Sequence, residues 1–161
     1  MRWFGFGFGF LGRRDSSSVI CGMQIETETH GFGEGDASLR AAGGFEGLID
    51  LVEKFYRVMD EVPEGARIRS MHPKDLTVSK DKLARFLCGW LGGPRLFNEK
   101  YGPISIPAVH AHLVVGEEGR DAWLFCMRLA LEEVDYEPAF KAYLIRALGV
   151  PAERIRSIAR G

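Results

Sequence analysis

From Gly43 onward, apolar residues recur along this chain at steps of three and four, which is the spacing of one face of an α-helix. The first such face consists of Phe45, Leu48, Ile49, Val52, Phe55, Tyr56, Met59 and Val62. The same pattern predicts helices over about 79–91, from about 117 to 134, over 138–149, and a short last helix over 151–159. Convincing pairs of strands are missing, so we expect an all-α protein.

The segments between these helices carry residues that end helices. Gly92, Gly93 and Pro94 end the second predicted helix, because glycine has permissive torsions and proline lacks an amide hydrogen. A linker is predicted to precede that helix and to run through Pro73. Residues 95–116 are predicted to be irregular.

Residues 1–40 are rich in Gly, Ser and Thr and lack sustained periodicity. We therefore expect a poorly ordered N-terminal extension over 1–40, followed by one domain over 41–161. Met23 could instead be the true start of the protein. The phenylalanines from Phe4 to Phe10 could also pack on the domain or on a partner.

The charge balance argues against some classes of protein. With 21 Lys and Arg against 22 Asp and Glu, the formal net charge is −1, which favours neither nucleic acid nor an anionic membrane as a partner.

The three cysteines, Cys21, Cys88 and Cys126, leave one thiol unpaired in any disulfide scheme and match no zinc or redox motif. We therefore expect a cytoplasmic protein, either a monomer or a homodimer.

Four side chains are placed where the predicted helices could line a common pocket. Tyr56 and Trp123 lie on apolar helix faces, and each has one hydrogen-bond donor that needs a partner when buried. His72 lies in the linker, and His110 lies just before the third strong helix. Each also has an ordinary structural explanation, as a core aromatic or a surface histidine, and His110 with His112 could be half of a zinc site.

The segment Phe86–Pro94, with the sequence FLCGWLGGP, resembles the F-x-x-G-W-x-G-G-P segment of the group II truncated haemoglobins of bacteria. The chain is also similar to that family in the order and spacing of three later features. These are EKYG at 99–102, a histidine that follows it, and RDAWL at 120–124. Upstream, Phe55-Tyr56 and Met71-His72-Pro73 fit as well. The resemblance covers about residues 43–150 and implies a globin-like fold, the truncated two-over-two helical sandwich, that binds haem b, iron protoporphyrin IX.

The resemblance also implies which residue ligates the iron and which residues contact the porphyrin. The proximal histidine of the family falls on His110, nine residues after Tyr101 and six before Gly116. One imidazole ligand leaves the other face of a pentacoordinate iron free for a gas. The family positions that contact the porphyrin fall on Phe55, Leu83, Phe86, Leu87 and Leu113.

On the distal side, the ligand-stabilising residues of the family fall on Tyr56, His72 and Trp123. Bound oxygen gains partial negative charge, so phenol and indole donors should hold it. His72 could add a third donor or tie down Tyr56. Ser79 and Leu83 match positions over the distal pocket, and we expect no iron capture by a histidine from their helix, since both are small or apolar.

The run Val109-His110-Ala111-His112-Leu113 departs from the family, which carries a basic residue before the proximal histidine and a Pro-Phe pair after it. That basic residue can pair with a haem propionate. Its replacement could be Lys82, Lys100, Tyr101 or His112, and His112 could also compete as the iron ligand.

Three functions are consistent with these residues. The first is reversible binding of oxygen, or of nitric oxide or carbon monoxide, at the haem. The second is a haem redox enzyme that reduces peroxide or oxidises nitric oxide, with an external reductase as partner. The third is a haem-free helical module for interaction with another protein. We expect the first.

Overall fold

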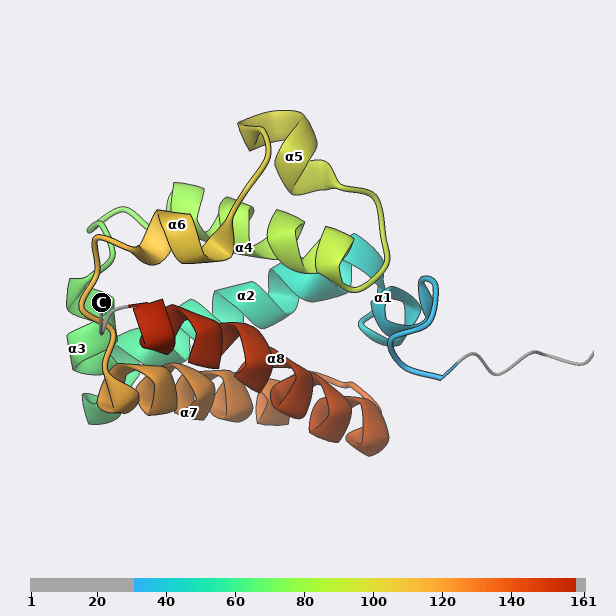
Figure 1. Ribbon diagram of the computed structural model, residues 1–161. Coiled ribbons are helices and arrows are strands. Elements are labelled where there is room, and N and C mark those ends of the chain that lie inside the picture. Colours follow the sequence, from blue (N-terminus) through green and yellow to red (C-terminus); the bar gives the residue numbers. More distant parts are fainter. Residues whose placement is uncertain (1–30, 159–161) are drawn as a thin grey trace, which may run out of the picture.

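The structure, a computed structural model, describes residues 31–158, which form helices and turns without a strand (Figure 1). The elements are α1 (Ala37–Ala41), α2 (Gly44–Glu61), the 3-10 turn η1 (Pro63–Gly65), α3 (Ala66–Ser70), α4 (Thr77–Trp90), α5 (Leu96–Tyr101), α6 (Ile106–His110), α7 (Glu117–Glu133) and α8 (Pro138–Ile158). The predicted all-α class is confirmed. None of the helices in this part of the chain is long and apolar enough to cross a membrane.

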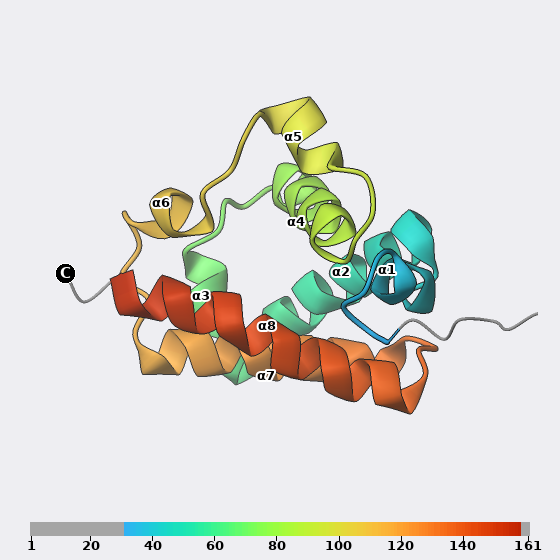
Figure 2. The same ribbon diagram turned by 45° about the vertical axis from the view of Figure 1, so that its right-hand side comes forward.

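Two pairs of long helices build the core of the fold. Helices α7 and α8 run side by side in both views, and α2 packs against α7 and against α4 (Figures 1 and 2). The pair of α2 and α4 therefore lies over the pair of α7 and α8, which confirms the expected two-over-two sandwich. Of the short helices, α5 packs on α4, and α6 packs on α8.

The core lies where the four long helices meet, because each presents its apolar stripe to the others. The aromatic rings of Phe55 on α2 and Trp123 on α7 pack together across the two layers, with their centroids 5.1 Å apart. The largest fully buried side chains are Phe55, Phe140, Leu48, Leu51, Met59, Leu87, Met127, Leu144, Leu148, Val52, Cys88 and Cys126. Both of these cysteines are free thiols in the core.

The predicted bounds of the long helices agree with the structure to within about two residues, apart from the end of α8. Helix α4 begins at Thr77 rather than at residue 79, because Asp75 assists its first turn. The carboxylate of Asp75 accepts a hydrogen bond from the backbone amide of Thr77 at 2.9 Å. Such local bonds are typical of the residues that precede a helix.

The linker and the irregular segment predicted from the sequence contain short helices, so those two predictions are wrong in part. The turn η1 and helix α3 lie in the linker, and α5 and α6 lie within 95–116. These elements have three to six residues, too few for a 3.6-residue period to appear. Tertiary packing stabilises them: Ile68 of α3 is buried against the core.

Helix α8 continues through Pro151, where the sequence predicted a break after Gly149. Proline removes one hydrogen bond of the helix ladder, and contacts with the rest of the fold offset this loss. Ala152 is buried, and the carboxylate of Glu153 accepts a hydrogen bond from Arg120 of α7 at 2.6 Å. The last turns of α8 are therefore held against the rest of the domain.

The described part of the expected extension, residues 31–40, packs on the domain. The ring of Phe32 lies 5.2 Å from that of Phe140 and 5.3 Å from that of Tyr143, both on α8. The backbone amide of Gly33 donates to the hydroxyl of Ser38 at 2.9 Å. The expected boundary at residue 40 thus falls within a packed segment. Met23 and the phenylalanines at 4–10 lie outside the described residues.

Candidate functional site

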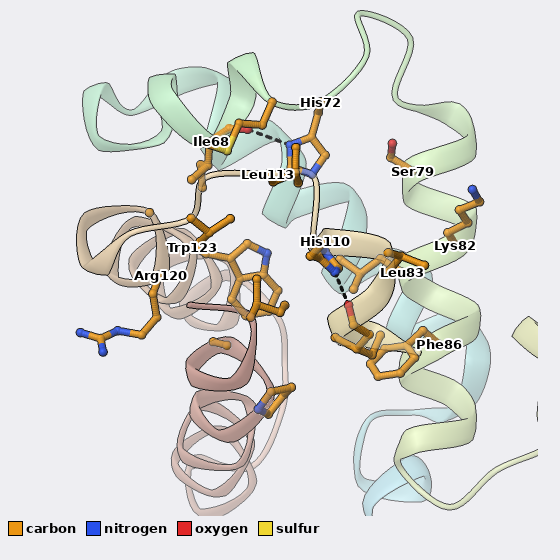
Figure 3. A pocket seen from close by; sticks show the side chains of 18 of the residues that line it. Ile68, His72, Ser79, Lys82, Leu83, Phe86, His110, Leu113, Arg120 and Trp123 are labelled. Carbon is orange, nitrogen blue, oxygen red and sulfur yellow. Dashed lines mark hydrogen bonds between the residues drawn. The ribbon is translucent and has the colours of Figure 1, made fainter. Parts of the chain in front are cut away.

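A cavity of about 420 Å³ is lined by residues of helices α2 to α8 (Figure 3). Most of its lining is apolar, and none of the described residues that line it is an aspartate or a glutamate. Of the side chains predicted for the site, the cavity brings together Tyr56, His72, Ser79, Lys82, Leu83, Phe86, Leu87, His110, Leu113 and Trp123. Residues more than 60 positions apart in the sequence therefore meet around one space.

Two predicted site residues, Phe55 and Tyr101, do not line the cavity. Phe55 is fully buried one layer behind it, with its ring 5.1 Å from those of Tyr56 and Trp123. Tyr101 donates a hydrogen bond from its hydroxyl to the carboxylate of Asp81 at 2.6 Å. The ring of Tyr101 also lies 5.2 Å, centroid to centroid, from that of Phe97, which lines the cavity, so both residues support lining residues from outside.

His110 is the last residue of α6, and a bond to the backbone of the same helix orients its imidazole. Its Nδ1 lies 2.7 Å from the carbonyl oxygen of Ile106 (Figure 3). A carbonyl oxygen only accepts hydrogen bonds, so Nδ1 carries the proton and Nε2 carries the lone pair. Because a hydrogen bond at one ring nitrogen orients the other for a metal, His110 has the arrangement of a metal-ligating histidine.

His72 lies between α3 and α4 and is held in the same way. Its Nδ1 lies 2.8 Å from the carbonyl oxygen of Ile68, so Nε2 again carries the lone pair. Burial lowers the pKa of His72 and the nearby positive charge of Arg69 adds to this, although the bond to Ile68 opposes the shift. The ring is therefore neutral at neutral pH, and its Nε2 is an acceptor.

Tyr56 and Trp123 each bring one hydrogen-bond donor to the cavity lining. Burial raises the pKa of Tyr56 to about 12, partly opposed by the positive charge of Arg69, so the phenol keeps its proton at neutral pH. The ring of Tyr56 meets that of His72 edge to face, with the centroids 5.4 Å apart. The half-buried Trp123 reaches the same space from α7 (Figure 3).

The positively charged lining residues differ in their partners. Arg120 pairs with Asp121 at 2.8 Å and with Glu153 at 2.6 Å. The ammonium group of Lys82 lies 5.2 Å from the centroid of the Tyr101 ring. Lys100, a predicted candidate for the propionates, does not line the cavity, because it pairs with Asp81 at 2.9 Å. His112, another candidate, lines the cavity and is exposed.

Sequence reasoning missed the part of the lining that α8 contributes. These residues are Leu148, Pro151, Ala152 and Ile155. Their steps of three and four are those of a helix face, but Pro151 hides the continuity of the helix. No cluster of three metal-ligating His, Cys, Asp or Glu side chains occurs among residues 31–158, so His110 and His112 are not joined there by a third zinc ligand.

Comparison with known proteins agrees with this geometry. The model of the bacterial-like globin family matches residues 39–153. The group 2 truncated haemoglobin YjbI of Bacillus subtilis is 33% identical over 112 residues, which are 70% of this chain and 83% of that protein. The chain therefore belongs to the bacterial-like globins, among the group II truncated haemoglobins.

Solved structures of this group have the same fold. The group II 2-on-2 haemoglobin of Agrobacterium tumefaciens is 32% identical, with a TM-score of 0.71 over 83% of this chain and 98% of that chain. A truncated oxygen-avid haemoglobin from Bacillus subtilis is also 32% identical, with a TM-score of 0.67 over 73% of this chain and 97% of that chain. The expected family and fold are confirmed.

Membership of this family implies a haem cofactor, and the residues of the cavity fit one. A porphyrin is a large apolar plate with two carboxylates, and the cavity is apolar and has no acidic side chain in its described lining. An imidazole nitrogen with a free lone pair, Nε2 of His110, lies in that lining. The protein is thus a haem-binding globin.

Proposed function

We propose that the protein binds haem b through His110 and reversibly binds oxygen, or another diatomic gas, at the opposite face of a pentacoordinate iron. The observation that carries this proposal is the bond between Nδ1 of His110 and the carbonyl of Ile106, which leaves Nε2 free as a ligand. Bound haem supplies an iron that can coordinate a gas. The chain supplies one axial ligand and the surroundings of the gas.

His110 is a better axial ligand than His112 on the geometry of the two side chains. The hydrogen bond to Ile106 orients the half-buried ring of His110. His112 is exposed and has no hydrogen-bond or ion-pair partner among residues 31–158. Orienting a free side chain costs conformational entropy, so the ring that the fold already holds is favoured.

The distal residues have distinct tasks in this proposal. A diatomic ligand that gains negative charge accepts hydrogen bonds from the indole of Trp123 and the phenol of Tyr56. His72 offers an acceptor rather than a donor, since its Nδ1 proton is used by Ile68. We therefore assign His72 the second of its two expected roles, that of tying down Tyr56, through the edge-to-face contact of their rings, which leaves the single hydroxyl proton of Tyr56 for the ligand.

An absorption spectrum of the purified protein tests the proposal, recorded in the ferric form and in the ferrous form with carbon monoxide. We expect a Soret band that shifts with carbon monoxide in the wild type and is lost or altered in His110→Ala. The matched control is His112→Ala, which should keep the wild-type spectrum. Absence of a Soret band after addition of haemin would leave only the fold and would favour the haem-free interaction module. A spectrum altered only in His112→Ala would move the axial ligand to His112.

A further inference from the structure

The residue before His110 is Val109, which has no charge or hydrogen-bond donor in its side chain to pair with a haem carboxylate. We propose that His112, two residues after His110, donates a hydrogen bond to a haem carboxylate, with the ammonium group of Lys82 as a second contact. This inference rests on the proposed haem binding. It concerns where the carboxylates lie and not which residue ligates the iron.

The cavity needs such a contact because its ligand is both apolar and anionic. Removing a carboxylate from water is unfavourable unless a cation or a hydrogen-bond donor pairs with it. Five lining residues have basic side chains: His72, Lys82, His110, His112 and Arg120. The structure separates them by the partners that each already has.

Three of the five basic side chains are already engaged. Arg120 forms ion pairs with Asp121 and Glu153, so its charge is balanced within the protein. The Nδ1 protons of His72 and His110 are donated to the carbonyls of their own backbone segments. Their remaining nitrogens carry lone pairs, which repel a carboxylate.

Lys100 and Tyr101 could also bind a carboxylate, but both are already paired with Asp81. Its carboxylate accepts the hydroxyl proton of Tyr101 at 2.6 Å and pairs with Lys100 at 2.9 Å. It also pairs with Arg85 at 2.9 Å. Lys100 and Tyr101 therefore belong to a closed cluster between α4 and α5, outside the lining of the cavity.

Lys82 and His112 remain, and both are exposed side chains of the cavity lining. The ammonium group of Lys82 faces the Tyr101 ring and has no carboxylate partner among the described residues. In the same part of the chain, His112 has neither a hydrogen bond nor an ion pair. A carboxylate that meets these side chains stays partly hydrated, which avoids most of the cost of burying a charge.

The rate at which haem leaves the protein tests the assignment. Wild type and His112→Ala, each loaded with haemin, are mixed with an excess of an apoglobin that captures released haem. We expect His112→Ala to lose haem about five- to tenfold faster, the range for one charge-assisted bond at a partly exposed site. Lys74→Ala, which removes an exposed cation outside the cavity lining, should lose haem at the wild-type rate.

Haemin dimethyl ester, in which both carboxylates are esterified, isolates the contact. With this ligand, His112→Ala and wild type should release the porphyrin at the same rate, because the charged acceptor is gone. Equal acceleration with both ligands, or no acceleration with either, would overturn the role of His112. Failure of the wild type to take up haemin at all would overturn the proposed function and this inference together. An unchanged Soret spectrum in His112→Ala separates the carboxylate contact from iron ligation.

Discussion

The hydroxyl of Tyr136 donates a hydrogen bond to the carbonyl oxygen of Gly47, 2.7 Å away, and joins the α7–α8 connection to α2. The two residues are 89 positions apart, and Tyr136 is buried. Tyr136→Phe should lower the free energy of unfolding by about 1 kcal/mol, the usual net value of one such bond. Urea denaturation checks this, and an unchanged midpoint would show that water replaces the bond at no cost.

The turn after α4 should depend on Gly92. Its φ of +92° is unfavourable for other residues, and a Cβ there would lie 1.7 Å from the carbonyl oxygen of Gly35. Gly102 has a similar φ of +81° with open space around it. Gly92→Ala should therefore destabilise the protein by well over 1 kcal/mol, and by more than Gly102→Ala. Thermal unfolding of the two variants compares Gly92→Ala, which has both backbone strain and a clash, with Gly102→Ala, which has backbone strain alone. Equal losses of stability in the two variants would contradict the predicted clash.

The Asp81 cluster should make part of the stability depend on acid pH. Partial burial raises the pKa of Asp81, but bonds from Tyr101, Lys100 and Arg85 outweigh it and hold the pKa at about 2. A carboxyl whose pKa is lower in the folded than in the unfolded protein stabilises the fold at pH values above its unfolded pKa of about 3.9. This stability is lost as the pH falls toward about 2.

Asp81→Asn removes this titrating group while keeping its approximate shape. The variant should therefore be less stable than wild type at neutral pH, and the difference should shrink between about pH 4 and pH 2. Unfolding free energies measured across this range check the prediction. A difference that stays constant with pH would mean that the charge of Asp81 contributes nothing to the contact between α4 and α5.

The proposed distal donors should govern how long oxygen stays bound. Trp123→Phe and Tyr56→Phe each remove one donor and keep an aromatic ring, so each should raise the oxygen dissociation rate about fivefold or more, for a bond of about 1 kcal/mol. Stopped-flow replacement of oxygen by carbon monoxide measures the rate. Trp90→Phe, an exposed residue outside the cavity, is the control. Unchanged rates in both distal variants would reject their assigned role.

The long helices could be predicted because their apolar faces repeat over many turns. The face that begins at Phe45 and the four-residue steps after Pro138 mark helices that the structure contains. The turn at Gly92 could also be predicted, since local torsions are sufficient to end a helix. Helices α3, α5 and α6 could not, because elements of five or six residues show no period.

The candidate site was predictable mainly through family resemblance. Periodicity indicated that Tyr56 and Trp123 point inward, but it did not place His72 or His110, which lie outside the long helices. The spacing between Tyr101 and Gly116 selected His110. The cavity lining from the last turns of α8, including Ala152, was hidden behind Pro151.

The amino-acid sequence by itself thus determined the all-α class, the long helices and the residue types available for a haem site. Only the tertiary structure decided which of those residues line one cavity and which nitrogen atoms remain free. It directs the Nδ1 proton of His110 to Ile106 and engages Lys100 with Asp81, while His112 keeps no such partner among the described residues. The physical reason is that helix faces follow from local spacing. Hydrogen bonds and ion pairs instead depend on atoms that packing brings within about 3 Å.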